Sequence, residues 1–180
     1  SGSVIHAMNG EQDMRKMGVL AKILPFTYGM MLIGSLSLMG MPFLTGFYSK
    51  DVILEVAYGS YTNAGHFAYV LGSMAAFLTA FYSFRLLYLT FLSKPNGYRA
   101  LLVHAHEAPW RMALPLFILS IPSIFIGYLT KDMIIGLGTD FWRGAIYIQP
   151  KNFTLIDAEN IPIVPKLLPV CLSFLGALSS

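Results

Sequence analysis

The chain has 180 residues, of which 56% are hydrophobic and 12% are charged, and its mean hydropathy is +0.62. A soluble domain carries roughly a quarter charged residues to keep its surface hydrated, so the composition argues against a water-soluble enzyme. The net charge of +3 does not indicate nucleic-acid binding, because the 12 Lys and Arg residues are scattered over short polar segments. The single cysteine, Cys171, excludes an internal disulfide and a multi-cysteine metal site.

Three stretches, 23–49, 56–84 and 112–130, contain no charged residue, and each is long enough for a transmembrane helix of about 20 residues. A fourth apolar stretch, 167–180, is shorter. The expected fold class is therefore all-α transmembrane. Lys and Arg gather before residue 23 and between 94 and 111, so the positive-inside rule places those segments on the inner side.

In chain order, the sequence predicts the following segments: the end of a truncated helix and an inner polar loop (1–22), a discontinuous transmembrane helix broken near 39–43 (23–57), a transmembrane helix (66–93), an inner polar loop (94–111), a transmembrane helix (112–130), an outer loop (131–166) and the start of a truncated transmembrane helix (167–180).

The break within 23–57 is expected at Gly40 and Pro42. Pro42 has no N–H to donate and its ring clashes with the carbonyl of Leu38, while Gly40 weakens the preceding turn. An interrupted helix leaves unpaired backbone groups, which a membrane protein tolerates where they are buried in protein or line a wet cavity, and such interruptions mark ion sites in transporters. Proline kinks without ion chemistry are also common in membrane helices.

Lys50 and Asp51, directly beyond the break, are the candidate catalytic residues for proton transfer. A low-dielectric setting disfavours the charged form of a lysine, whereas an adjacent carboxylate favours it, and this opposition suits a proton-loading site. The alternative is that Lys50 belongs to the polar end of a long span and extends its side chain to the membrane interface.

Two further candidates are His6, a relay because imidazole titrates near neutral pH, and Arg85, an anchor at the inner end of the second span. The sequence His104-Ala-His106-Glu107 has the residue types of a metal site. Without a second group of ligands, however, it predicts a solvated loop. We expect no metal site and no cofactor in this chain.

Several parts of the chain resemble the chain 5 family of mitochondrial NADH:ubiquinone oxidoreductase, complex I. They are residues 3–18, 40–54, 81–85 and 127–133 and the His-Ala-His-Glu loop. The resemblance implies the C-terminal portion of an antiporter-like membrane subunit, and therefore an antiporter-like helix bundle fragment with one discontinuous helix. Lys50 matches the ionisable lysine of that discontinuous helix, and Asp51 matches its acidic neighbour. His6 follows the helix that in relatives carries a central lysine and histidine.

The implied function is proton translocation through a half-channel at the broken helix, coupled to quinone reduction elsewhere in an H⁺-translocating NADH:ubiquinone reductase. Flavin, iron–sulfur clusters and quinone would belong to partner subunits, and this chain would perform no redox chemistry. The implied partners are the neighbouring antiporter-like subunit, the chain carrying the missing helices, other membrane-arm subunits and lipid, without nucleic acid.

The implied location is the mitochondrial inner membrane, as a multi-pass protein, with the bacterial plasma membrane as the alternative. Two other functions stay open. The chain could be the large subunit of a multisubunit sodium/proton antiporter, or a non-catalytic assembly subunit whose helices only hold its neighbours.

Overall fold

The computed structural model describes residues 2–97, 102, 105–134, 140–143, 145 and 153–180, and within these ranges it contains helices and no strand. This confirms the all-α prediction. The elements in chain order are α1 (Gly2–Ala7), a 3₁₀ turn (Met14–Lys16), α2 (Leu20–Ile23), α3 (Pro25–Met39), α4 (Thr45–Gly59), α5 (Asn63–Leu87), a π-helical turn (Tyr88–Leu92), α7 (Trp110–Ile134), α8 (Thr154–Glu159) and α9 (Ile163–Leu178).

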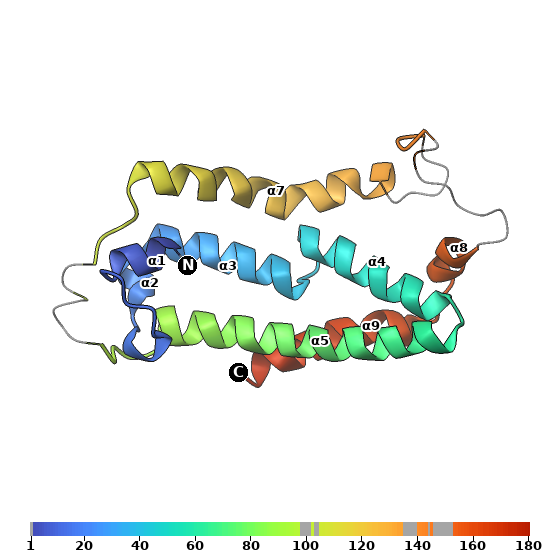
Figure 1. Cartoon of the computed structure of the whole chain (residues 1–180), viewed down its shortest axis with the longest axis horizontal. Helices are drawn as coiled ribbons and strands as arrows, with labels where there is room; N and C mark the ends of the chain where they lie inside the picture. The colour runs from blue at the N-terminus through green and yellow to red at the C-terminus, as the bar shows by residue number, and fades with distance from the viewer. Residues whose placement is uncertain (1, 98–101, 103–104, 135–139, 144, 146–152) are drawn as a thin grey trace.

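The long helices lie side by side along one direction (Figure 1). α3 and α4 follow each other through the middle of the bundle, where α7 packs on both of them and α5 also contacts both. α9 packs along α5. The short helices α1 and α2 lie at one end of the molecule and α8 lies at the other. The interruption between α3 and α4 is therefore surrounded by helices near the middle of the bundle.

Two helices in the described part of the chain are long and apolar enough to cross a membrane, judged by length and composition. They are Asn63–Leu92, which comprises α5 and the π-helical turn, and α7 at Trp110–Ile134. α7 leaves many large apolar side chains exposed, among them Leu119 at 65% and Leu129 at 72%. A water-soluble surface rarely exposes so continuous an apolar face, so α7 is suited to contact lipid or another protein.

The helices at the C-terminal side extend beyond the predicted segments. α7 begins at Trp110 and continues to Ile134, and α9 begins at Ile163. The prediction counted only charge-free stretches, whereas Arg111 and Lys166 are helical residues near helix ends. Pro165 does not prevent the early start of α9, because a proline in the first turn removes no intrahelical hydrogen bond. α8 lies within the segment 131–166 that was predicted as an outer loop.

A buried apolar cluster joins α1 and α2 to the π-helical turn. Met8, Leu20, Leu24 and Phe91 are among its fully buried members, and the ring of Tyr28 lies 5.2 Å from that of Phe91, centroid to centroid. This cluster packs the N-terminal segment against the end of α5.

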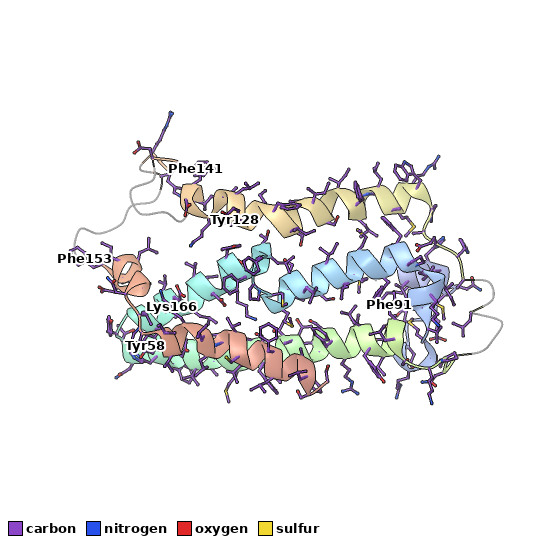
Figure 2. The ribbon with its side chains drawn as sticks, turned by 180° about the vertical axis from the view of Figure 1, so that it is seen from behind. Tyr58, Phe91, Tyr128, Phe141, Phe153 and Lys166 are labelled. Atoms are coloured by element: carbon purple, nitrogen blue, oxygen red, sulfur yellow. The ribbon has the colours of Figure 1, made fainter. Side chains whose placement is uncertain are left out.

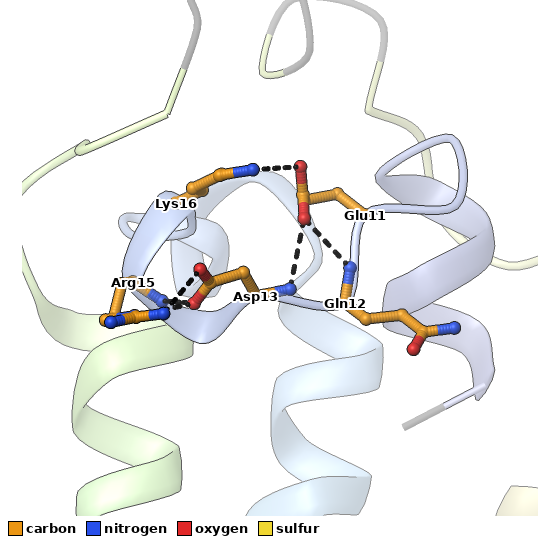
Figure 3. A network of polar contacts seen from close by, with 5 residues as sticks. All are labelled: Glu11, Gln12, Asp13, Arg15 and Lys16. Carbon is orange, nitrogen blue, oxygen red and sulfur yellow. Dashed lines mark hydrogen bonds and ion pairs between the residues drawn. The ribbon is translucent and has the colours of Figure 1, made fainter.

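The polar segment between α1 and α2 is stabilised by its own charges (Figure 3). Glu11 accepts hydrogen bonds from the backbone N–H groups of Gln12 and Asp13, and Lys16 lies 3.3 Å from its carboxylate. Asp13 caps the 3₁₀ turn through the N–H of Arg15 and pairs with its guanidinium at 3.1 Å. These hydrogen bonds lower the pKa of both carboxyl groups.

Candidate functional site

The interruption between α3 and α4 has a defined backbone geometry. α3 ends at Met39, and Gly40 follows in the left-handed conformation with φ +82° and ψ +41°. The N–H of Met41 donates to the carbonyl of Leu36 at 3.0 Å, which closes the helix end as in a Schellman motif. Pro42 lies outside both helices, so its missing N–H costs no helical hydrogen bond. That α3 and α4 together cross a bilayer as one interrupted span stays a prediction.

The start of α4 lies directly against the last turns of α3. The N–H of Gly46 donates to the Ser37 hydroxyl at 3.3 Å, and a Cβ added to Gly46 would overlap the carbonyl oxygen of Ser37. A glycine is therefore needed at this point of contact. The two helices overlap sideways at the interruption instead of meeting end to end.

Lys50 extends back across the interruption to the end of α3. Its Nζ donates to the carbonyl oxygen of Met39 at 3.1 Å, and a Cβ added to Gly40 would lie 3.4 Å from its Cδ. The last carbonyls of a helix lack intrahelical partners and carry the negative end of the helix dipole. The site thus places a half-buried ammonium group on a backbone acceptor that favours its positive charge.

A cavity of about 650 Å³ adjoins this lysine and is lined by residues of α3, α4, α5 and α7. Lys50 is the one charged residue among those that line it. The polar groups that share the lining are hydroxyls: Ser37, Thr45, Ser49, Thr79 and Ser123. Hydroxyls can both donate and accept hydrogen bonds, so this cavity could hold water beside Lys50.

Asp51 is half-buried on α4 and is not among the residues that line this cavity. Within the described residues, no hydrogen bond or ion pair joins its carboxylate to Lys50. Asp51 and Glu55 are four residues apart and therefore share a face of α4. The structure thus places Asp51 beside Lys50 in the helix but not in direct contact with its ammonium group.

The other two predicted site residues lie far from the interruption. His6 is exposed on α1, at the end of the molecule where α3 begins, whereas the interruption follows the other end of α3 (Figure 1). α3 has 15 residues and is therefore about 22 Å long. Arg85 is exposed in the last turn of α5. The structure does not bring either residue together with Lys50, and their roles stay predictions.

The expectation of a solvated loop at His104-Ala-His106-Glu107 is wrong for Glu107. Its carboxylate accepts a hydrogen bond from the N–H of Phe26 at 2.8 Å and another from the hydroxyl of Thr27 at 2.9 Å. Glu107 thus caps the N-terminus of α3 from 81 residues away. The signal in the sequence was the absence of a capping side chain at Leu24, before Pro25.

Of the two histidines of this loop, only His106 belongs to the described residues. The ring of His106 lies 6.1 Å from that of His6, centroid to centroid, in an edge-on arrangement. His104 lies outside the described residues. Among the residues that are described, no group of three or more His, Cys, Asp and Glu side chains could hold a metal ion.

Comparisons with known proteins match nearly the whole chain. Residues 1–79 match the family described as NADH:quinone oxidoreductase/Mrp antiporter, TM. The chain is 62% identical over 176 residues to a protein of Phytophthora infestans named NADH-ubiquinone oxidoreductase chain 5, 60% identical over 178 residues to one of Marchantia polymorpha and 56% identical over 178 residues to one of Arabidopsis thaliana with the same name.

Each of these three matches covers 98% of this chain but only 26% to 27% of the relative. The chain therefore spans about a quarter of the length of the relatives that it matches. The expected resemblance is confirmed over that quarter, and Lys50 lies within the part that matches the antiporter family.

Proposed function

We propose that this chain is part of the proton-translocating membrane arm of respiratory complex I. The proposal agrees with the resemblance of the chain to NADH-ubiquinone oxidoreductase chain 5. The observation that carries the proposal is the hydrogen bond from Lys50 to the Met39 carbonyl, at an interruption between two helices and beside a largely apolar cavity whose lining includes hydroxyl groups. Such a place suits an ionisable group that exchanges protons, because intramembrane lysines are costly unless they have a partner or water.

In the proposed mechanism, Lys50 is the group that takes up and releases the proton. The charged form donates a hydrogen bond to the Met39 carbonyl and is stabilised by the C-terminal end of α3. The neutral amine forms when one proton passes to water in the cavity, directly or through a hydroxyl that passes its own proton on to water, and a proton from the other side restores the charge. Asp51 acts at a distance, through its negative charge, and favours the protonated lysine.

The wider assignments are proposals that rest on the name of the relatives. The chain would be a subunit of an H⁺-translocating NADH:ubiquinone reductase in the mitochondrial inner membrane, and the eukaryotic relatives favour this location over a bacterial plasma membrane. Quinone reduction, flavin and iron–sulfur clusters would belong to partner subunits. The partners would be the neighbouring antiporter-like subunit, other membrane-arm subunits and lipid.

A multisubunit sodium/proton antiporter is the second candidate, because the description of the matched family also names the Mrp antiporter. The two functions share a lysine-based exchange site but differ in what drives it. The chain 5 relatives favour the respiratory complex. A role in assembly alone is the third candidate, and it predicts that the charge of Lys50 is dispensable.

The test is to replace Lys50 in the assembled complex. Lys50→Ala removes the ionisable group, and Lys50→Arg keeps a positive charge that does not release its proton at working pH. Lys22→Ala is the matched control, because Lys22 is an exposed lysine at the end of α2. Native gels of solubilised membranes would show assembly, and proton transfer per NADH oxidised would be measured in membrane vesicles.

We expect both Lys50 variants to assemble and to pump fewer protons per NADH than the wild type and the Lys22 control. If both variants assemble and pump normally, the proton-transfer proposal fails and the assembly role is favoured. If a sodium gradient alone drives proton exchange in the absence of NADH, the sodium/proton antiporter becomes the favoured function and the complex I proposal fails.

A further inference from the structure

The hydroxyl of Thr45 is inserted into the backbone of a neighbouring helix. Thr45 Oγ1 donates to the carbonyl oxygen of Pro122 at 2.8 Å and accepts a hydrogen bond from the N–H of Gly127 at 3.0 Å. Both backbone groups belong to α7 and are five residues apart. A side chain that bridges two backbone groups in this way is one of the recognised causes of a bend in a helix.

The sequence of α7 is adapted to this contact at both positions. Pro122 cannot donate an N–H and its ring disturbs the preceding turn, so α7 is expected to bend there, and Figure 1 shows it bent near its middle. Gly127 is buried, and a Cβ added to it would lie 2.6 Å from the Cα of Thr45. Because that neighbour is backbone, only a movement of one helix could make room.

A second contact fixes the same two helices against each other. The rings of Tyr48 on α4 and Tyr128 on α7 lie 6.2 Å apart, centroid to centroid, and Figure 2 labels Tyr128 on α7. Thr45 is the first residue of α4, and Tyr48 is one turn further along. The beginning of α4 is therefore held by α7 on one side, while Gly46 packs against α3 on the other.

The position of the Lys50 side chain depends on where α4 begins, because Lys50 lies five residues after Thr45 and both residues line the same cavity. α3, α5 and α7 contribute no charged side chain to that lining. The charged groups closest to Lys50 in sequence, Asp51 and Glu55, are on its own helix. The distance between its ammonium group and the Met39 carbonyl is thus set by the placement of α4 as a whole.

We propose that Thr45 is a positioning residue for Lys50, acting through its paired hydrogen bonds to Pro122 and Gly127 of α7. The inference rests on the proposed function, since it concerns the efficiency of proton transfer at Lys50. It assigns α7 a part in that transfer: a displacement of α7 at its bend shifts the start of α4, and with it the ammonium group relative to the end of α3.

The experiment compares Thr45→Val, which keeps the shape but loses the hydroxyl, with Thr45→Ser, which keeps the hydroxyl. Lys50→Ala is measured beside them in the assembled complex in membrane vesicles. The readouts are assembly on native gels and the pH profile of protons pumped per NADH oxidised. We expect Thr45→Val to assemble, to pump about fivefold less and to shift the pH profile, and Thr45→Ser to restore both.

Gly127→Ala tests the same contact from α7, without altering Thr45. We expect it to reduce pumping and shift the pH profile in the same direction, because its Cβ displaces the start of α4. Gly29→Ala is the matched control, since a Cβ at Gly29 on α3 would meet nothing within 4 Å in this chain. If Thr45→Val does not assemble, Gly127→Ala decides the question.

The outcomes separate the two proposals. If Lys50→Ala lowers pumping while assembled Thr45→Val and Gly127→Ala keep the wild-type pH profile, the positioning role is overturned and the proton-transfer proposal stands. If Lys50→Ala pumps normally, the proton-transfer proposal itself falls, whatever Thr45→Val does. A loss of assembly without any change in the pH profile of the remaining complexes identifies Thr45 as a structural residue only, which also overturns the inference.

Discussion

The carboxylate of Glu107 accepts a hydrogen bond from the hydroxyl of Thr27 at 2.9 Å, although 80 residues separate the two in sequence. The same carboxylate accepts the N–H of Phe26. Thr27 is almost completely buried, so its hydroxyl needs this partner. The loop before α7 thereby determines how α3 begins.

Replacing Glu107 by Ala should therefore destabilise the start of α3. The loss of a helix cap costs about 1 kcal/mol, and the buried Thr27 hydroxyl loses its acceptor as well. We expect a lower temperature of thermal inactivation for the solubilised complex and a smaller loss for Glu107→Gln, which keeps one carbonyl acceptor. Asp132→Ala, at an exposed position near the end of α7, serves as the control. Equal thermal stability of Glu107→Ala and the wild type would show that the cap contributes nothing.

Replacing Gly40 by Ala should affect both the interruption and Lys50. Gly40 has φ +82°, a conformation that costs an L-residue roughly 1 to 2 kcal/mol, and the added Cβ would touch the Lys50 side chain. We expect lower thermal stability together with fewer protons pumped per NADH. Gly29→Ala again provides the control within α3. A variant with normal stability and normal pumping would contradict the geometry of this turn.

The polar segment of Figure 3 should loosen in acid. Hydrogen bonds from the Asp13 N–H and from Lys16 lower the pKa of Glu11, and those from Arg15 lower the pKa of Asp13. A carboxyl group whose pKa is lowered in the folded state stabilises it above the unfolded pKa, and this contribution is lost as the pH falls through the lowered value. The loss should therefore occur below the ordinary values of 4.5 and 3.8.

Hydrogen exchange of the Gln12, Asp13 and Arg15 amides would measure this loosening. At about pH 7 we expect faster exchange in the double variant Glu11→Gln, Asp13→Asn than in the wild type, because the neutral side chains accept weaker hydrogen bonds. At about pH 3 the wild-type carboxyl groups are becoming protonated and the difference should shrink. A difference that is the same at both pH values would assign the protection to packing instead of charge.

The features that could be predicted from the sequence are those with a local cause. The end of α3 was expected near Gly40 and Pro42 because these residues act on their own backbone, and α3 does end at Met39. The charge-free stretches 56–84 and 112–130 overlap most of α5 and α7. The starts of α7 and α9 were placed too late, since Arg111 and Lys166 lie in the first turns of these helices, where a charged side chain is tolerated.

The contacts that organise the site could not be predicted, because each joins residues far apart in sequence. Nothing local to Thr45 indicates that its hydroxyl bonds to α7, 77 residues away at Pro122. Glu107 was interpreted as part of a solvated loop for the same reason. The location of Lys50 after the break was evident, but its hydrogen bond to Met39 depends on how α4 folds back beside α3.

α3 ends up with an anion at its positive end and a cation at its negative end, supplied by Glu107 and Lys50 from other parts of the chain. The helix, about 22 Å long, thus has a side chain of opposite charge at each end, and the proposed cycle removes and restores the charge at the Lys50 end. When Lys50 releases its proton, the positive end of the α3 dipole would still face Glu107, whereas the negative end at Met39 would no longer face a cation. The electric field along α3 would therefore alternate with every turnover, and side chains beside it would experience that alternation without any movement of the backbone.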